Sequence, residues 1–284
     1  PTQNRSQQDV AVIIEIVSAT RMNEQDFWQH SALGQSLVTQ LIQNPNLSVN
    51  VTFENTCGLS EVFNAAIAQA DDEAILVFIH DDVWIDDAQF TQAVLAGLNQ
   101  FDIIGVAGNK RRLPKQPAWA FIDTQFTWDT QENLSGKVAH GETAQGKISE
   151  YGDVPAECEL LDGVFLAAKK QTLVTQQVRF DPQFDFHFYD LDFCRSARLA
   201  DLTLGTWPIQ LTHQSGGAFG SASWQWHYQQ YLQKWHEQEL PDNDVADVSN
   251  VHIFELTTVD ATVQAFNATQ LYPAVEYTIQ AIPI

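Results

Sequence analysis

The sequence predicts an α/β fold with a mainly parallel sheet and flanking helices. Over the first 107 residues, four apolar runs with strand character are separated by three helical patterns, an order typical of parallel α/β sheets. The run from Ala74 to Ile79 is apolar without a break, as in a strand buried on both faces. Residues from Leu59 to Ala70 carry apolar side chains at helical spacing, which predicts a helix packed on that sheet.

The composition limits the partners of the chain. Its 284 residues include 14 Lys and Arg and 36 Asp and Glu, which gives a net charge of −22. Such a surface repels nucleic acid and anionic lipid, and we expect neither as a partner. No stretch approaches the ~20 apolar residues of a transmembrane segment, and no signal peptide is evident. Three cysteines without metal-ligand spacing favour a reducing compartment, so we expect the cytoplasm.

The first half of the chain is expected to supply most of the sheet. The expected strands are 10–17, 49–53, 74–79 and 103–107, and the expected helices are 24–43, 59–70 and 87–99. Glu24 and Asp26 lie where the dipole of the first helix favours acids, and Asn44-Pro45 ends that helix. The chain contains neither Gly-x-Gly-x-x-Gly nor Gly-x-x-x-x-Gly-Lys, so the usual glycine-rich phosphate loops are excluded.

The second half of the chain is less regular. Residues 109–158 contain Pro114, Pro117 and several glycines, and we expect a long irregular excursion or lid there. The elements expected after it are a strand over 160–168, a short helix that starts near residue 189 and a helix over 224–239. We expect one domain over 10–240 and a small β-rich extension over 241–284, which either forms a homodimer contact or holds an acceptor.

The strand over 74–79 stops at His80-Asp81-Asp82. In open α/β sheets, ligands bind outside the carboxyl ends of the strands. Oxygen and imidazole ligands at that place suit Mg²⁺ or Mn²⁺. The alternative interpretation is an acidic surface turn after a strand.

Asp190 and Asp192 fall in the first turn of a short helix. Carboxylates are common there for electrostatic reasons alone, so helix capping is one interpretation. Aromatic residues precede this helix, and an aromatic environment removes water from a carboxylate, raises its pKa and makes it a better base. We therefore predict that Asp190 is a general base, and that Asp192 points well away from it. The aromatic residues are Phe184, Phe186, Phe188 and Tyr189.

Two further features are candidates for chemistry. His213 follows a strand and precedes a Ser-Gly-Gly loop, which suits a metal ligand, although a lone histidine is more often structural. Lys110-Arg111-Arg112 is a basic cluster in an acidic chain. It either meets a phosphate group or balances neighbouring acids.

Taken together, four motifs resemble the GT-A glycosyltransferases of family 2, and more closely the StrF-like subgroup of streptomycin biosynthesis. The resemblance covers about residues 10–225. The order and spacing of the motifs make it specific, with His213 following at the expected place. The motifs are Gly58-Leu-Ser-Glu-Val-Phe-Asn64, Phe78-Ile-His-Asp-Asp-Val83, Leu161-Asp-Gly-Val-Phe-Leu166 and Phe188-Tyr-Asp-Leu-Asp-Phe-Cys194.

The resemblance implies a metal-dependent enzyme that transfers a sugar from a nucleotide diphosphate, expected to be UDP, to a hydroxyl acceptor with inversion. The Asp-x-Asp motif of the family, which holds Mn²⁺ or Mg²⁺ against the diphosphate, matches the segment that starts at His80. Asp82 and His213 are therefore the implied metal ligands, and the role of His80 stays open. The Glu-Asp pair of the family, which supplies the catalytic base, matches Tyr189-Asp190. The Glu is replaced by Tyr189, and the Asp that acts as the base is retained as Asp190.

The resemblance also implies which residues contact the substrates. Glu54 would contact uracil, and residues 18–21 would lie over the base and ribose. The residues implied for the nucleotide-sugar are Ser18, Thr20, Arg21, Glu54, Asn55, Asn64, Asp81, Lys110, Asp162 and Gly163. Those implied for a carbohydrate or other hydroxyl acceptor are Trp119, His187 and Tyr189.

Two other function classes remain open at this stage. A metal-dependent phosphohydrolase also uses His-Asp pairs, but it needs more clustered His and Asp residues than this chain offers. A non-catalytic module that binds a sugar or nucleotide is compatible with the altered Asp-x-Asp and Glu-Asp motifs. Turnover of a nucleotide-sugar, with and without an acceptor, separates these classes.

Overall fold

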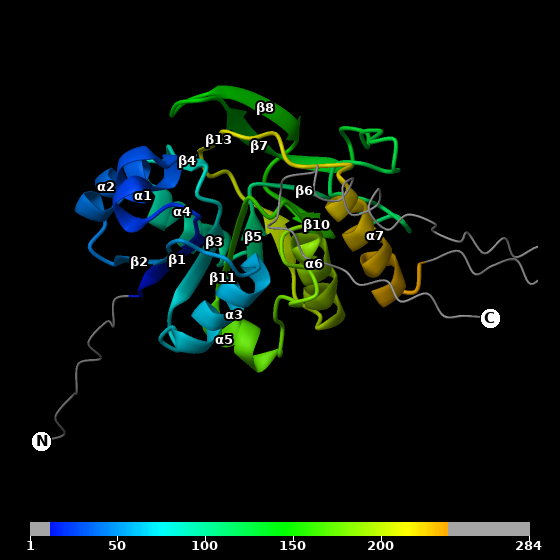
Figure 1. Ribbon diagram of the computed structural model, residues 1–284, viewed down its shortest axis with the longest axis horizontal. Helices are drawn as coiled ribbons and strands as arrows, with labels where there is room; N and C mark the ends of the chain where they lie inside the picture. Colours follow the sequence, from blue (N-terminus) through cyan, green and yellow to red (C-terminus); the bar gives the residue numbers. More distant parts are fainter. Residues whose placement is uncertain (1–11, 238–284) are drawn as a thin grey trace, which may run out of the picture. The chain divides into compact units, whose positions relative to one another are not determined.

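The computed structural model describes residues 12–237, and the expected extension over 241–284 lies outside them. Residues 12–217 form one compact unit, and residue 218 begins a second one. The strands are β1 (Ile14–Ala19), β2 (Leu47–Thr52), β3 (Ile75–Ile79), β4 (Val83–Ile85), β5 (Ile103–Gly105), β6 (Ala107–Asn109), β7 (Leu134–His140), β8 (Lys147–Gly152), β9 (Ala156–Cys158), β10 (Leu160–Leu161), β11 (Phe165–Lys169), β12 (Leu204–Thr206) and β13 (Leu211–His213) (Figure 1).

Seven helices accompany these strands in the described part of the chain. The first unit contains α1 (Glu24–His30), α2 (Ala32–Gln43), α3 (Leu59–Gln69), α4 (Phe90–Gly97), α5 (Lys170–Thr175) and α6 (Tyr189–Leu199), and the second contains α7 (Ala222–Lys234). Among residues 12–237, no helix is long and apolar enough to cross a membrane.

The main sheet is mixed, with the strand order β2-β1-β3-β11-β5-β12-β9. Strands β2, β1 and β3 run parallel, as do β5 and β12. The α/β class is confirmed. Strands β3 and β5 are separated by β11, which pairs antiparallel with both. This insertion joins segments far apart in the sequence, which local patterns do not report.

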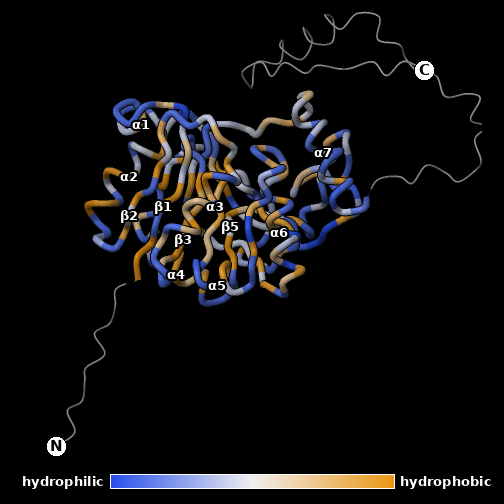
Figure 2. The backbone as a smooth tube through the Cα atoms, turned by 60° about the horizontal axis from the view of Figure 1, so that its bottom comes forward, coloured by the Kyte–Doolittle hydropathy of each residue, from blue (hydrophilic) through white to orange (hydrophobic). Residues whose placement is uncertain are grey.

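Strand β3 forms the centre of the core. All five of its residues are buried, as the unbroken apolar run predicts. Phe78 of β3 packs against Phe63 of α3 and against Phe180, with ring centroids 5.0 Å apart in both pairs. The expected apolar face of α3 is buried, and the hydrophobic segments of the chain gather in the strands of this sheet (Figure 2).

A second sheet has the order β10-β6-β7-β13-β4, with β8 paired to β7. The chain passes from the first sheet to the second at Val106, between β5 and β6. The expected irregular excursion over 109–158 is therefore wrong in its second part, where β7 and β8 form a hairpin. Strand β7 pairs with β6 and β13 as well, so distant partners stabilise a segment whose own pattern is polar and glycine-containing.

Several expected elements are divided in the structure. The expected helix over 24–43 is two helices, because the Ser31 side chain accepts a hydrogen bond from Gly34 N at 2.8 Å and begins α2. The expected strand over 160–168 breaks at Asp162-Gly163 into β10 and β11, which belong to different sheets. The expected helix over 87–99 is the shorter α4, and β4 precedes it.

Helix α7 is described by itself because it lies in the second unit. It begins two residues before the expected start, since the Ser221 side chain accepts a hydrogen bond from Trp224 N at 3.1 Å. Trp224 and Tyr228 stack on one face of the helix, with centroids 5.4 Å apart. This is the contact expected of aromatic residues at i and i+4.

Candidate functional site

The structure brings His80, Asp82 and His213 together. Asp82 follows β3, and His213 ends β13, which pairs with β4 so that His213 lies opposite Val83. One ligand atom from each of the three side chains falls within 4.8 Å of the others. His213 Nε2 lies 3.3 Å from Asp82 Oδ2, and His80 Nδ1 lies 4.0 Å from Asp82 Oδ1. The two sheets therefore meet at a cluster of two imidazoles and one carboxylate.

The Asp82 carboxylate has the charge and the unbonded oxygen that a cation requires. Its Oδ1 atom is buried and has no hydrogen-bond partner among the described residues, an arrangement that costs free energy unless a ligand compensates it. Burial opposes ionisation, but the hydrogen bond and charge of His213 outweigh it and hold the pKa of Asp82 well below its usual range. Asp82 is thus ionised and has one oxygen available. Two imidazoles and a carboxylate fit a divalent transition-metal ion.

His80 has a defined tautomer. Tyr189 donates its one hydroxyl proton to the Gly163 carbonyl at 2.8 Å, so the 2.8 Å contact between His80 Nε2 and Tyr189 Oη requires a proton on Nε2. Burial is the main cause that lowers the pKa of His80, which leaves Nδ1 with a lone pair. That lone pair faces Asp82, and two such acceptors gain stability from a cation between them.

Asp190 lies at the start of α6 and faces the same region. Its Oδ2 accepts a hydrogen bond from Gly163 N at 3.0 Å, and its Oδ1 accepts one from Leu191 N at 2.9 Å. Burial, followed by the negative charge of Asp162, raises the pKa of Asp190 to about 7. Phe188, which precedes the helix, has a left-handed backbone with φ of 65°, a strained conformation that the surrounding packing must hold. Asp190 is a carboxylate with a pKa suited to base catalysis at neutral pH.

Asp162 joins this region to the loop over 110–133. Its Oδ1 accepts a hydrogen bond from Val164 N at 3.0 Å, and its Oδ2 accepts one from Trp119 Nε1 at 2.9 Å. The Asp162 charge also raises the pKa of Tyr189, after the larger effect of burial. Asp162 therefore organises the turn between β10 and β11 that carries Gly163.

A second group of predicted residues lies where β1 and β2 end. Ser18 is fully buried, and its Oγ has no hydrogen-bond partner among the described residues. Burial raises the pKa of Asp81, and a hydrogen bond with Thr20 partly opposes it. Asn55 N donates to the Thr20 carbonyl at 2.8 Å, and Glu54 N donates to the Met22 carbonyl at 2.9 Å.

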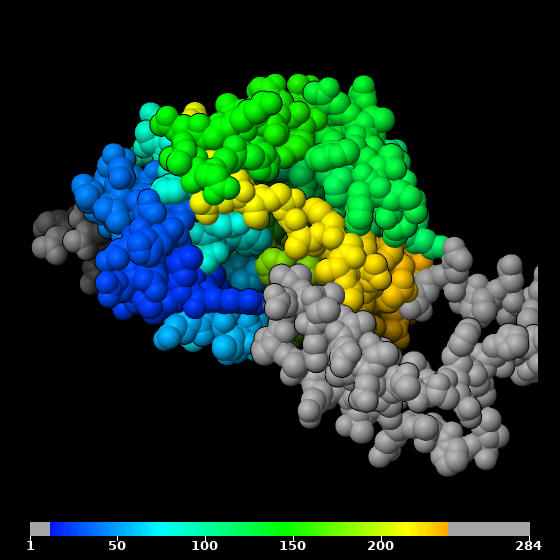
Figure 3. Space-filling view, turned by 45° about the horizontal axis from the view of Figure 1, so that its top comes forward, coloured from blue at the N-terminus to red at the C-terminus, as the bar shows by residue number. Residues whose placement is uncertain are grey.

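Arg21 is exposed in the loop after β1, and Glu54 is exposed after β2. The predicted nucleotide residues of these two strands thus share one edge of the sheet. A hollow opens there in the space-filling view, between the blue N-terminal elements and the green β7–β8 hairpin (Figure 3).

Some predicted contact residues are hydrogen-bonded to other parts of the chain. The Asn64 amide donates to the Phe180 carbonyl at 2.6 Å and accepts from Phe180 N at 3.1 Å, so it holds the segment before α6. Lys110 Nζ donates to the Glu132 carbonyl at 2.8 Å. His187 and Tyr189, expected to contact the acceptor, are buried. Both hydrogen-bonding positions of the Tyr189 hydroxyl are occupied by protein groups, which corrects its expected role.

The sequence did not indicate two polar residues beside the metal cluster. His140 of β7 lies opposite His213 of β13, with ring centroids 6.1 Å apart. His140 Nε2 lies 3.0 Å from the hydroxyl of Tyr151 on β8. A lone histidine in a segment expected to be irregular carries no local signal, because only the pairing of β7 with β13 places it here.

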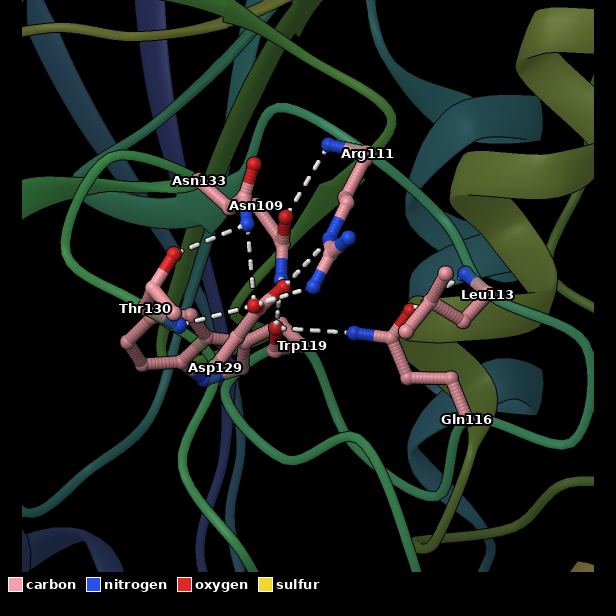
Figure 4. A network of polar contacts seen from close by, with 8 residues as sticks. All are labelled: Asn109, Arg111, Leu113, Gln116, Trp119, Asp129, Thr130 and Asn133. Atoms are coloured by element: carbon pink, nitrogen blue, oxygen red, sulfur yellow. Dashed lines mark hydrogen bonds and ion pairs between the residues drawn. The ribbon is translucent and has the colours of Figure 1, made fainter.

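The loop over 110–133 is held by Asp129, whose side chain is 1% exposed. Arg111 donates to both of its oxygens, at 2.9 and 2.5 Å. Asn109, Thr130 N and Asn133 donate to it at 2.7 to 3.0 Å, and Figure 4 shows these groups converging on the carboxylate. For Arg111, the basic cluster therefore balances an acid, one of the two interpretations left open.

Replacing Asp129 with alanine should destabilise the protein. Several buried donors would lose their acceptor, and an unsatisfied buried polar group costs ~1–3 kcal/mol. Urea unfolding should show this loss, whereas Gln131→Ala, at an exposed position of the same loop, should unfold close to the wild type. Equal stability of the Asp129 variant and the wild type would contradict the anchoring role.

Comparisons with known proteins find a matching family model and several similar solved structures. The family model described as a glycosyltransferase-like family matches residues 40–230. A comparison with curated proteins finds no match. Among solved structures, the catalytic domain of Drosophila β1,4-galactosyltransferase 7 with xylobiose is 10% identical, with a TM-score of 0.40 and coverage of 69% of this chain and 64% of that one.

Two other solved structures have similar scores. GalNAc-T7 with UDP, GalNAc and Mn²⁺ is 11% identical, with a TM-score of 0.46 and coverage of 80% of this chain and 49% of that one. The mannosyltransferase of Pyrobaculum calidifontis with GDP-Man and Mn²⁺ is 13% identical, with a TM-score of 0.42 and coverage of 82% and 68%. The chain thus spans less than two thirds of the galactosyltransferase and GalNAc-T7 chains.

The family assignment rests on the extent of the match with the family model. That match begins in α2 and continues into α7, and it includes all four residues that form the metal-ligand cluster and the candidate base. The StrF-like subgroup stays a prediction. The mixed α/β fold is of the GT-A type, and the chain belongs to the glycosyltransferase-like family.

Proposed function

We propose that the protein is a metal-dependent, inverting glycosyltransferase that moves a sugar from a UDP-sugar to a hydroxyl acceptor. The observation that carries this proposal is the pairing of two features on one edge of the sheet. One is the cluster of His80, Asp82 and His213, and the other is Asp190, with a pKa of about 7. The first would hold a cation that stabilises the charge on a diphosphate leaving group, and the second would accept the proton of an acceptor hydroxyl.

The metal would be held by His80 Nδ1, Asp82 and His213 Nε2. When bound, a divalent ion supplies Lewis-acid stabilisation of the charge that develops on the diphosphate. Arg111 is paired with Asp129 in the loop over 110–133, so its charge is already balanced by an acid. Because two of the three ligands are imidazoles and Mg²⁺ prefers oxygen, we propose Mn²⁺ rather than Mg²⁺.

Asp190 would accept the proton of the acceptor hydroxyl as the hydroxyl oxygen attacks the anomeric carbon. One displacement, with the base behind the attacking oxygen, inverts the anomeric configuration. The backbone donors from Gly163 and Leu191 leave lone pairs on both carboxylate oxygens for that proton. At the other end of the site, Ser18 Oγ and the exposed Glu54 are proposed to contact the uridine.

A transfer assay tests the proposed function. The protein is incubated with Mn²⁺, a panel of UDP-, GDP- and dTDP-sugars and a panel of pyranoside acceptors, and NMR determines the anomeric configuration of the product. We expect an inverted product from a UDP-sugar and no product in EDTA. A retained configuration, or equal turnover in EDTA, would overturn the proposal.

Tyr189→Phe should weaken Mn²⁺ binding about 10–100-fold, the usual effect of removing a group that orients a metal ligand. The ring would still pack against Phe63 and Phe180, while His80 would lose the partner of Nε2. Calorimetric titration of Mn²⁺ in the presence of UDP measures the change. Tyr151→Phe removes a hydroxyl that bonds His140 instead, and it serves as the matched control.

Unchanged Mn²⁺ affinity in the Tyr189 variant would exclude His80 as an oriented ligand.

A further inference from the structure

Trp128 is a large aromatic side chain that is 52% exposed. Its ring stacks on that of Tyr151, with centroids 5.9 Å apart and an interplanar angle of 14°. Trp119 meets Tyr151 edge-on at 5.0 Å, and Phe121 meets Trp128 edge-on at 5.1 Å. These rings form an aromatic platform, defined here as Trp128 and Tyr151, supported by Trp119 and Phe121.

The platform is rigid. Trp128 forms an isolated β-bridge with Phe121, and the Asp123 side chain closes the turn between them by accepting from Gln125 N and Thr127 N at 3.0 Å. Asp129, the next residue, is the anchor of the hydrogen-bond network in Figure 4. The indole is about half exposed on a constrained backbone, so its exposed part is preorganised for binding.

Two independent connections place this platform beside the catalytic groups. In the first, Trp119 Nε1 donates a hydrogen bond to Asp162 Oδ2 at 2.9 Å. The next residue, Gly163, donates its backbone N–H to Asp190. Through the Tyr151 hydroxyl, the platform reaches His140 at 3.0 Å, which lies next to His213. The platform is therefore linked to the candidate base through Trp119 and Asp162, and to the metal cluster through His140.

The chemistry of the platform selects its ligand. Aromatic faces carry a partial negative potential, which attracts the C–H bonds on one face of a pyranose ring. A chain with net charge −22 disfavours a polyanionic acceptor. We propose that the aromatic platform of Trp128 and Tyr151 binds a neutral pyranose ring of the acceptor and presents its hydroxyl to Asp190. This inference rests on the proposed function and specifies its acceptor class.

Titration of Trp128→Ala with neutral pyranosides tests the inference. The probes are the methyl glycosides of glucose, galactose, mannose and N-acetylglucosamine, and saturation-transfer NMR reads their binding with and without UDP and Mn²⁺. Loss of ring stacking worth about 1.4 kcal/mol corresponds to a tenfold change, so we expect a Kd at least about tenfold higher. Trp128→Phe should retain part of the affinity.

Trp226→Ala, which removes a tryptophan that is 49% exposed on α7, is the matched control and should bind as the wild type. Failure of the wild type to bind any pyranoside, or equal binding by Trp128→Ala, would overturn the inference. UDP binding measured on the same samples keeps the two proposals distinct. A protein that binds pyranosides through Trp128 but shows no metal-dependent UDP binding would contradict the proposed function and leave the platform intact.

Discussion

Replacing Asp190 with asparagine is expected to lower the rate of sugar transfer by ~10²–10⁴-fold, the usual cost of losing a general base. Asparagine keeps the shape of the side chain, but it has no basic oxygen, and its one amide oxygen can accept from Gly163 N or from Leu191 N, not from both. The metal cluster shares no side chain with Asp190, so UDP and Mn²⁺ should bind with near wild-type affinity. Steady-state rates beside a UDP titration measure both quantities.

The pH dependence gives a second measurement on the same residue. Because the pKa of Asp190 is about 7 and a base must be deprotonated, the wild-type rate should rise with pH through about 7. The residual rate of Asp190→Asn should lack this rise. A flat wild-type profile would show that the observed step does not depend on Asp190.

The raised pKa also predicts an effect on stability. The folded state binds the proton of Asp190 more tightly than the unfolded state, where a carboxyl has a pKa of about 3.9. The contribution to stability is therefore complete below that pKa and is lost as pH rises through about 7. Asp190→Asn does not ionise, so its melting temperature relative to that of the wild type should be higher at pH 8 than at pH 5.

Asp192→Asn is the control for these measurements. Asp192 is fully buried two residues along α6, so its replacement should change the melting temperature more than the chemical step. Near wild-type transfer by Asp190→Asn would mean that the base lies elsewhere.

Replacing Asp82 with asparagine is expected to abolish metal-dependent nucleotide binding. Asp82 is the one carboxylate in the cluster with the two imidazoles. Removing a group that only orients a metal ligand lowers metal affinity by up to ~100-fold, so removing a direct ligand should lower it by at least that factor. At UDP concentrations of ~100 times the dissociation constant, the wild type should gain about 2.7 kcal/mol of stability with Mn²⁺. The variant should gain almost nothing.

Thermal unfolding with UDP, in Mn²⁺ and in EDTA, measures this difference. His213→Ala should behave like the Asp82 variant, while His30→Ala, at an exposed position of α1, should respond like the wild type. Equal stabilisation by UDP in Mn²⁺ and in EDTA would contradict a metal bridge to the diphosphate.

The sequence by itself determined the elements whose cause is local. The unbroken apolar run of β3 predicts a buried central strand, and the side chains at helical spacing in α3 predict its buried face. The acids that follow β3 and those that open α6 were identified for the same reason, since strand ends and helix starts are visible in a local pattern. The candidate base and the first part of the metal site were therefore predictable.

Only the tertiary structure decided how these parts meet. The insertion of β11 between β3 and β5, the pairing of β13 with β4 and the hairpin of β7 and β8 join segments that are distant in the sequence. These pairings place His213 next to Asp82 and His140 next to His213. Backbone pairing between distant strands depends on the packing of the whole sheet, which no local pattern encodes.

The same reason explains which predicted contact residues are hydrogen-bonded to other parts of the chain. Asn64, Lys110 and Tyr189 have side chains able to bind a substrate, and their place in a motif favoured that role. In the structure, each is bonded to a backbone or side-chain group far away in the sequence. Whether a polar group is available to a ligand depends on the partners that folding gives it, so residue type and spacing predicted the chemistry of the site, and tertiary contacts decided which residues are free to perform it.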